Sequence, residues 1–425
     1  MLHADPAALQ DNSMNWNGVV ELATNGLLWG SSTSGVRLAS GTGEFAPTAQ
    51  VGGEALDASS IHGMPVVRPQ LDGPSAISDA TLQIGAVHTL HPGAAEATRH
   101  FQHVLGHAAN GNLYVTPPGI PTVAQLHTDR MDGYVLQISG RKRWRVYASM
   151  PDAHNPVWGV MGNAEWGKEV GKPIPLHLVG QKLVDVVLKP GDILYVPRGF
   201  PHTTSTIIDG MNKGESNGDP SISLTVAVHT EAQHLVYEKL LRCTFSRSGY
   251  CEQPIPSRAE GKYCPIGLTM TNYARSEKGR ALRDSLPVGF LNEGGNGDWF
   301  SFVRALAHKA ERLMKTVLDR AEEEGVVGID DMLDNTEKLD KELVNVAGRV
   351  FHVQGQVLEA LEDMFAGSKK IGDVPFAERQ KRWAQLFGRI GAFAGDYCHK
   401  DGPNVFFMDY FSPDLEDDIV SKQMK

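Results

Sequence analysis

Short segments of alternating hydrophobic and polar residues dominate the chain between residues 81 and 234. In residues 221–229 the apolar side chains stand at every second position, from Ile222 to Val228, with polar or small residues between them. A period of two is typical of β-strands that bury one face. We expect such strands at residues 82–88, 112–116, 124–129, 133–139, 143–148, 184–188, 193–196 and 221–229.

Turn residues separate these segments at short intervals. Gly140 lies where two expected strands need a tight hairpin, and Pro190-Gly191 lies between two others. Many short strands with such turns predict a closed all-β unit, either a jelly roll or a barrel. Residues 94–109 can form a helix within this unit, with Phe101, Val104 and Leu105 on its buried face.

Beyond about residue 231 the spacing of apolar residues becomes helical. We expect helices at residues 234–244 and around residues 302–317, and an irregular segment at residues 251–265. The longest series starts at Leu339 and steps by threes and fours to Leu361, which predicts an amphipathic helix of several turns. An apolar helix face of this kind most often packs in the hydrophobic core of its own chain. A helix of this length could also pack against its counterpart across the axis of a dimer.

The pattern therefore predicts a mainly β N-terminal part followed by an α-helical C-terminal part. Within this division, residues 1–80 form a poorly defined N-terminal segment and residues 81–234 form the β domain. Residues 235–300 are expected to be a helical linker and a candidate dimerisation region. Residues 301–425 are expected to form a helical domain.

Composition and charge narrow the range of partners. The 40 Lys and Arg residues against 50 Asp and Glu residues give a formal net charge of −10, so strong binding to nucleic-acid phosphates is not expected. We recognise neither a secretory leader nor an apolar run long enough for a membrane, and we expect an intracellular protein. Its cysteines are then expected to be free thiols, with a disulfide among the first three as the alternative: Cys243, Cys251, Cys264 and Cys398.

Two distant stretches carry residues suited to a metal ion. His127 and Asp129 lie two positions apart in an expected strand, so their side chains should share one face. His202 follows the turn at residues 190–192 and lies at the mouth of another strand. Two imidazoles and one carboxylate, with other positions open, are typical of non-haem Fe(II) oxygenases. Taken alone, the first pair is explained more simply as a surface histidine and an aspartate in a turn. Only the two stretches together are specific evidence for a metal site.

Four segments closely resemble the ribosomal oxygenases: residues 112–119, 127–129, 136–147 and 189–202. These proteins are JmjC-type, cupin-fold 2-oxoglutarate oxygenases that hydroxylate ribosomal proteins. The resemblance covers about residues 81–234 and implies a double-stranded β-helix. Residues 281–287 are similar to the start of the region that follows the dimerisation helices of this family, so the resemblance also implies a homodimer. A winged-helix-like module is one option for residues 301–425, where the similarity is faint.

The resemblance implies a role for each matching residue. His127, Asp129 and His202 would hold Fe(II) and form the catalytic centre. Lys142 would bind the distal carboxylate of 2-oxoglutarate, which requires a cationic partner when it is buried. Alternation along residues 141–145 favours an inward Lys142 over one more solvated charge. The remaining cofactor-binding residues would be Asn112, Tyr114 and Thr225.

Several positions depart from the pattern of the family. Ala227 stands where a serine is usual, and Arg130 replaces a frequent second acidic residue after Asp129. Tyr114 lies one residue further from the first metal ligand than is usual. These departures concern the pocket for the protein substrate and leave the iron and cosubstrate positions intact. The other imidazoles that we weighed lack a partner at metal spacing and are expected to be structural: His154, His177 and His229.

The expected function is that of an Fe(II)- and 2-oxoglutarate-dependent dioxygenase. The resemblance implies hydroxylation of a His or Arg side chain in a ribosomal protein, or removal of a methyl group from a histone lysine as a variant. It also implies a nuclear or nucleolar location in a eukaryote and a cytoplasmic one otherwise. Two alternatives stay open: a small-molecule cupin metal enzyme without 2-oxoglutarate, and a non-catalytic binding module. Convergence of Lys142 with the expected metal ligands on one cavity would discriminate best between them.

Overall fold

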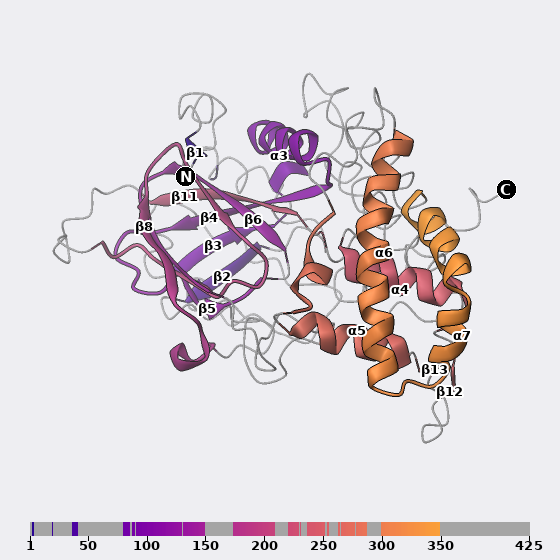
Figure 1. Ribbon diagram of the computed structural model, residues 1–425. Helices are drawn as coiled ribbons and strands as arrows, with labels where there is room; N and C mark the ends of the chain where they lie inside the picture. Colours follow the sequence, from indigo (N-terminus) through magenta and orange to yellow (C-terminus); the bar gives the residue numbers. More distant parts are fainter. Residues whose placement is uncertain are drawn as a thin grey trace.

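In the computed structural model of the chain, a β-barrel-like unit lies beside a group of helices (Figure 1). The first unit is built from strands that are distant in sequence, and the second from the helices that follow it. No helix among the described residues is long and apolar enough to cross a membrane. The described residues are 2–3, 19, 36–40, 80–85, 87–89, 91–129, 131–148, 173–208, 220–228, 230, 236–250, 253–254, 262–263, 265–276, 278–286 and 299–348.

Two antiparallel sheets make up the β unit. The larger sheet has the strand order β1 (Leu2–His3), β9 (Asp192–Val196), β6 (Asp132–Ser139), β11 (Ser221–Val228), β4 (Ala109–Thr116), β3 (Ala80–Ile84) and β2 (Val36–Ser40). The smaller sheet has the order β5 (Ala124–His127), β10 (His202–Ser205), β7 (Lys142–Tyr147) and β8 (Lys182–Leu188). Because β1 and β2 join the larger sheet, that sheet includes residues from the N-terminal segment.

Apolar side chains fill the space between the two sheets. Val135 and Val196 of the larger sheet belong to the same buried cluster as Trp144, Val146 and Leu188 of the smaller one. In β7 the buried and partly exposed positions alternate strictly, so its inner face is apolar apart from Lys142. Two facing sheets with interleaved strand order form the expected double-stranded β-helix, and the predicted fold class is confirmed.

Helix α3 (Pro92–Leu105) covers the outer face of the larger sheet, and its ends explain its length. Pro92 occupies the first turn, and the ring of His91 accepts a hydrogen bond from the Gly93 backbone N–H at 3.2 Å. Gly106 ends the helix in the left-handed conformation, at φ 65°. The helix is therefore shorter than the expected 94–109. The expected burial of Val104 is wrong, because this side chain faces solvent while Phe101 and Leu105 pack on the sheet.

Other boundaries also differ from the expected ones. The strand expected at residues 82–88 ends at Ile84, and Val87–Thr89 form a 3-10 helix, η2, in which His88 accepts a hydrogen bond from the Gly111 backbone N–H. The strand expected at residues 124–129 ends at His127, so Asp129 lies just beyond it. Strand β10 was not expected, and a further 3-10 helix, η4 (Leu176–Leu178), precedes β8.

The helical part has one continuous core. Helices α4 (Tyr237–Arg247), α5 (Pro265–Arg275), α6 (Trp299–Glu323) and α7 (Ile329–Asp334) share it with a further helical segment at residues 336–348. The helix expected at 234–244 is α4, and the helix expected around 302–317 is α6. Helix α5 was not expected. A short hairpin of β12 (Gln253–Pro254) and β13 (Lys262–Tyr263) lies before α5, and the 3-10 helix η5 (Arg280–Arg283) lies after it. Of the helix predicted from Leu339 to Leu361, the residues up to 348 are helical, and the rest lie outside the described residues.

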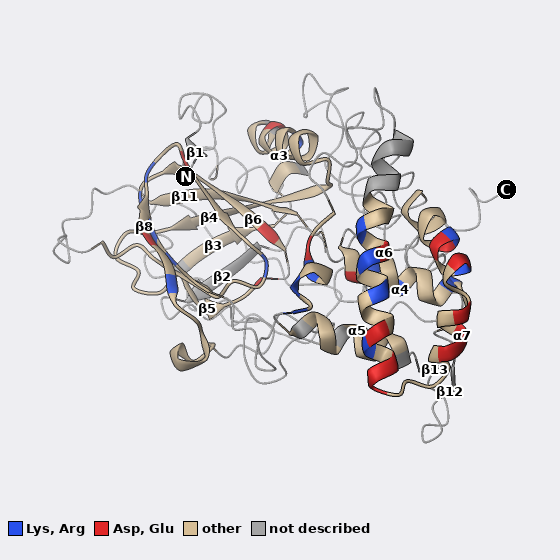
Figure 2. Ribbon diagram, viewed as in Figure 1, with Lys and Arg blue, Asp and Glu red and all other residues tan. Residues whose placement is uncertain are grey.

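Charged side chains are unevenly distributed over the helical part. Acidic residues gather at the C-terminal end of α6 and on α7, whereas basic residues lie along the middle of α6 (Figure 2).

In α4, Cys243 is disulfide-bonded to a partner outside the described residues. The expectation of free thiols is therefore wrong for Cys243, because folding brings a second cysteine within bonding distance, which sequence spacing does not determine. The other three cysteines lie outside the described residues.

Candidate metal and cofactor site

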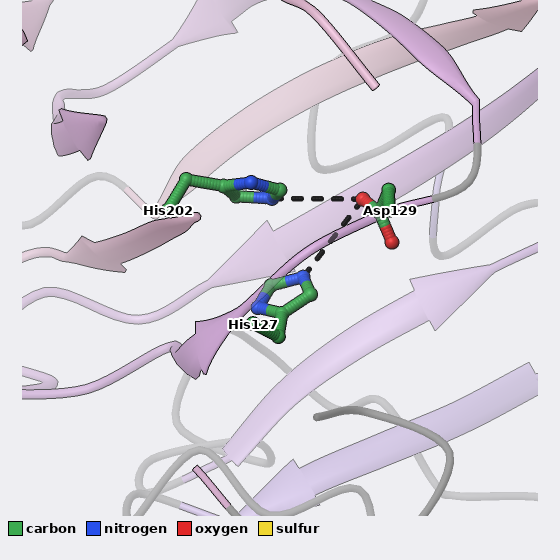
Figure 3. A group of neighbouring side chains, drawn as sticks. All are labelled: His127, Asp129 and His202. Atoms are coloured by element: carbon green, nitrogen blue, oxygen red, sulfur yellow. Dashed lines mark ion pairs between the residues drawn. The ribbon is translucent and has the colours of Figure 1, made fainter. Parts of the chain in front are cut away.

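Three side chains from the two distant stretches meet inside the β unit (Figure 3). The Oδ2 atom of Asp129 lies 3.8 Å from Nε2 of His127 and 3.5 Å from Nε2 of His202. One ligand atom from each residue lies within 4.8 Å of the others. Such spacing leaves room for one ion bound by all three atoms. Within the part of the chain that the structure describes, no other group of three or more such side chains has this spacing.

Backbone carbonyl groups orient both imidazole rings. Nδ1 of His127 lies 2.6 Å from the carbonyl oxygen of Gln125, and Nδ1 of His202 lies 2.9 Å from that of Phe200. A carbonyl oxygen can only accept, so each Nδ1 carries the proton and donates it. In this tautomer each Nε2 is the unprotonated nitrogen and faces the common centre, as a metal ligand requires.

Strand pairing fixes the distance between the two histidines. His127 and His202 are direct partners in the antiparallel pair of β5 and β10, and the register shifts immediately after this pair. The ring of Trp144 stacks on His202 with centroids 5.8 Å apart. Asp129 lies beyond the end of β5, where its carbonyl oxygen accepts a hydrogen bond from the Gly199 backbone N–H at 2.9 Å. The site therefore depends on contacts between two loops as well as on the strands.

Lys142 is a buried cation on the inner face of β7. Its residue surface is only 2% exposed, and Nζ lies 3.4 Å from Oγ of Ser223 and 5.9 Å from the ring centroid of Tyr114. Burial lowers the pKa of Lys142 from its ordinary 10.5 to about 7, because the ammonium loses its hydration. Lys142 forms no ion pair with the described residues. An anionic ligand group would supply the missing charge.

All seven residues predicted from the sequence line one pocket. It encloses about 720 Å³ of space, part of it open to solvent. The strand register explains the convergence, since Ser223 is paired with Tyr114 and Thr225 with Asn112 across β11 and β4. The seven lining residues are Asn112, Tyr114, His127, Asp129, Lys142, His202 and Thr225.

Two further pocket residues had not been given a role from the sequence. Ser223 contacts Lys142 directly, and Trp144 packs against a histidine of the candidate site. A signal for Ser223 was present, because the apolar positions of residues 221–229 are even-numbered and the odd-numbered side chains must face the pocket. Of the alternative imidazoles, His177 is exposed in η4, and His154 and His229 lie outside the described residues.

The donor set fits a small divalent metal and a dicarboxylate. Two neutral imidazoles and one carboxylate are the ligand set of facial Fe(II) sites, which keep positions open for other ligands. The buried ammonium of Lys142 on the same pocket suits a second anionic group, and the Ser223 hydroxyl beside it can donate a further hydrogen bond.

Residues 90–222 match the family model of the JmjC domain. Ribosomal oxygenase 1 of Danio rerio is 37% identical over 109 residues, which are 25% of this chain and 18% of that protein. The bifunctional lysine-specific demethylase and histidyl-hydroxylase NO66 of Drosophila erecta is 30% identical over 173 residues, covering 40% of this chain and 23% of that protein. The predicted resemblance to the ribosomal oxygenases is confirmed for this domain.

A structure of YcfD, a ribosomal oxygenase from Escherichia coli in complex with cobalt and 2-oxoglutarate, aligns with 62% of this chain and 56% of that chain. The identity is 18% and the TM-score is 0.30. The chain spans less than a quarter of the length of the curated relatives that it matches.

Proposed function

We propose that the chain is an Fe(II)- and 2-oxoglutarate-dependent oxygenase that hydroxylates a protein side chain. The observation that carries the proposal is the shared pocket of Lys142 with His127, Asp129 and His202. One cavity therefore holds both the three candidate metal ligands and a buried cation. That cation has no ion-pair partner among the described residues. A small-molecule cupin enzyme without 2-oxoglutarate has no need of that cation, whose burial in the protein without an anionic ligand is unfavourable.

The residues of the pocket would have distinct tasks. The Nε2 atoms of His127 and His202 and the carboxylate of Asp129 would hold Fe(II). Lys142 would bind the distal carboxylate of 2-oxoglutarate, and the hydroxyl of Ser223 would hold Lys142 in position. Bound iron and 2-oxoglutarate would supply oxygen activation, with conversion of the cosubstrate to succinate and CO2. The apolar side chains between the sheets would keep bulk water from the reacting groups.

The names of the relatives support a protein substrate. Some relatives are named as ribosomal oxygenases, and others as bifunctional lysine-specific demethylases and histidyl-hydroxylases. We therefore propose hydroxylation of a ribosomal-protein His or Arg as the main reaction and demethylation of a histone lysine as the second candidate. A homodimer formed through residues 235–300 is part of this proposal, and light scattering on the purified chain tests it.

The decisive experiment measures succinate release with a panel of ribosomal-protein peptides and methylated histone peptides. A mass increase of one oxygen on a ribosomal-protein peptide, dependent on both iron and 2-oxoglutarate, is the expected result. Loss of a methyl group from a histone peptide would instead favour the demethylase. His127→Ala should abolish turnover, whereas His177→Ala, at an exposed histidine, should not. Equal turnover by wild type and His127→Ala would contradict the proposal.

A further inference from the structure

Arg198 joins the loop that leads into His202 of β10 to the start of β6, which follows the loop that contains Asp129. It lies four residues before His202, and its partner Asp132 lies three residues after Asp129. The Arg198 backbone N–H donates to Oδ1 of Asp132 at 3.1 Å, and Nη1 donates to Oδ2 at 3.3 Å. The next residue, Gly199, bonds the carbonyl oxygen of Asp129. The two ligand loops are therefore held together by several hydrogen bonds besides the strand pairing.

The same guanidinium also reaches the helical part of the molecule. Nη1 donates to Oγ of Ser285 at 3.0 Å, and Nη2 donates to the carbonyl oxygen of Arg283. The flanking residues Leu282 and Leu286 are fully buried in the core of the helical part. Arg198 thus links that core directly to the loops of the metal site.

Further contacts hold residues 282–286, the segment that Arg198 binds, in place. Ser285 forms a β-bridge with Val236, and the Asp284 carbonyl oxygen accepts a hydrogen bond from the Tyr237 backbone N–H at 3.3 Å. Lys309 of α6 forms an ion pair with Asp284 at 3.1 Å. The segment is therefore fixed by both α4 and α6, so that its position follows the packing of these helices.

The position of Arg198 makes these bonds difficult to replace. Its side chain is 9% exposed and that of Asp132 is 10% exposed, so water cannot easily substitute for a lost partner. A guanidinium offers five N–H donors in one rigid plane, whereas an ammonium offers three on a flexible stem. Lysine would keep the charge but could not reach the Asp132, Ser285 and Arg283 acceptors together.

We infer that Arg198 is a positioning residue through which the helical part sets the spacing of Asp129 and His202. This inference rests on the proposed metal site. Arg198 is not among the residues that line the pocket, so it acts through the two ligand loops and not by touching the metal. The docking of the helices thereby becomes a condition for a tight metal site.

The test is a titration of the metal-free full-length protein with Mn²⁺, followed by the EPR signal of the free ion. Arg198→Lys should weaken Mn²⁺ binding about tenfold, the lower end of the effect of losing an outer partner of metal ligands. Ser285→Ala removes a single hydroxyl at the helical end and should weaken binding about threefold. The control is Arg143→Lys, because Arg143 makes a comparable two-bond ion pair with Asp185 away from the pocket.

Circular dichroism at the titration temperature would establish that each variant is folded, and Ser285→Ala keeps the test informative if Arg198→Lys does not fold. Weaker binding by both variants, with Arg143→Lys like wild type, supports the inference. It is overturned if Ser285→Ala binds Mn²⁺ like wild type, or if Arg143→Lys loses as much affinity as Arg198→Lys. Failure of the wild-type protein to bind Mn²⁺ would instead refute the proposed function.

Discussion

Replacing Lys142 with methionine is expected to stabilise the metal-free protein while abolishing its binding of 2-oxoglutarate. Lys142 is buried without an ion-pair partner among the described residues, and burial lowers its pKa to about 7. The ammonium form is therefore unfavourable in the folded protein until an anion binds. Methionine has a similar length and no charge, so it removes this cost together with the cosubstrate contact. Opposite effects on stability and binding distinguish a binding residue from a structural one.

The magnitude follows from the two pKa values. In the unfolded chain Lys142 takes up its proton below about pH 10.5, whereas the folded chain takes it up only below about pH 7. The decrease in the free energy of unfolding caused by buried Lys142 therefore grows as the pH falls from 10.5 to 7, and it stays constant below pH 7. Each pH unit corresponds to roughly 1 kcal/mol, so this cost is of order 4 kcal/mol at pH 7 and only about 1 kcal/mol at pH 9.5.

The assay is urea unfolding of wild type, Lys142→Met and Lys189→Met at pH 7 and pH 9.5. Lys189 is exposed, so its replacement controls for the loss of a lysine and should change the free energy of unfolding by less than about 0.5 kcal/mol. Lys142→Met should gain several kcal/mol at pH 7 and clearly less at pH 9.5. A gain no larger than that of Lys189→Met, or a gain independent of pH, would refute the reasoning.

Calorimetry with the Mn²⁺-loaded protein tests the other half of this prediction. Lys142→Met should bind no 2-oxoglutarate, while the affinity of the wild type should fall about tenfold for each pH unit above 7, because the carboxylate requires the protonated lysine. Unchanged binding by Lys142→Met would favour a cupin enzyme that does not use 2-oxoglutarate.

Three further predictions test the site and the fold. His202→Ala should weaken metal binding by more than about 100-fold, because a direct ligand matters more than an outer partner; calorimetric affinity equal to wild type would contradict the assignment. Gly140→Ala should lower the free energy of unfolding by about 2–3 kcal/mol, since its φ is +61° and a Cβ would lie 2.5 Å from the Pro220 carbonyl oxygen. Gly119→Ala, with open space around it, should cost less in the same urea titration, and the reverse order would be inconsistent with this account. The Arg143 hydrogen bond lowers the pKa of Asp185 to about 2, so Asp185→Asn should cost at most about 1 kcal/mol at neutral pH. That difference should disappear as the pH falls from about 4 through 2, and a pH-independent difference would argue against the ion pair.

Local patterns were enough to predict much of the β unit. A period of two specifies which side chains share a face, so Lys142 and Trp144 could be placed inward and the flanking arginines outward. The same rule brings Asn112, Tyr114 and Thr225 to one surface once their strands pair. Helix ends and short strands were predicted less well. Gly106 ended α3 early, and β10 is only four residues long and follows a turn.

The sequence by itself determined the chemistry available to this protein: two imidazoles and a carboxylate at metal-binding spacing, and a lysine on an inward-facing strand position. Tertiary structure alone decided that these groups meet. The pairing of His127 with His202, the contact of Ser223 with Lys142 and the reach of Arg198 to Ser285 join residues that are 75 or more positions apart. Local periodicity carries no information on such distances, because sheet closure and helix docking depend on the packing of the whole core.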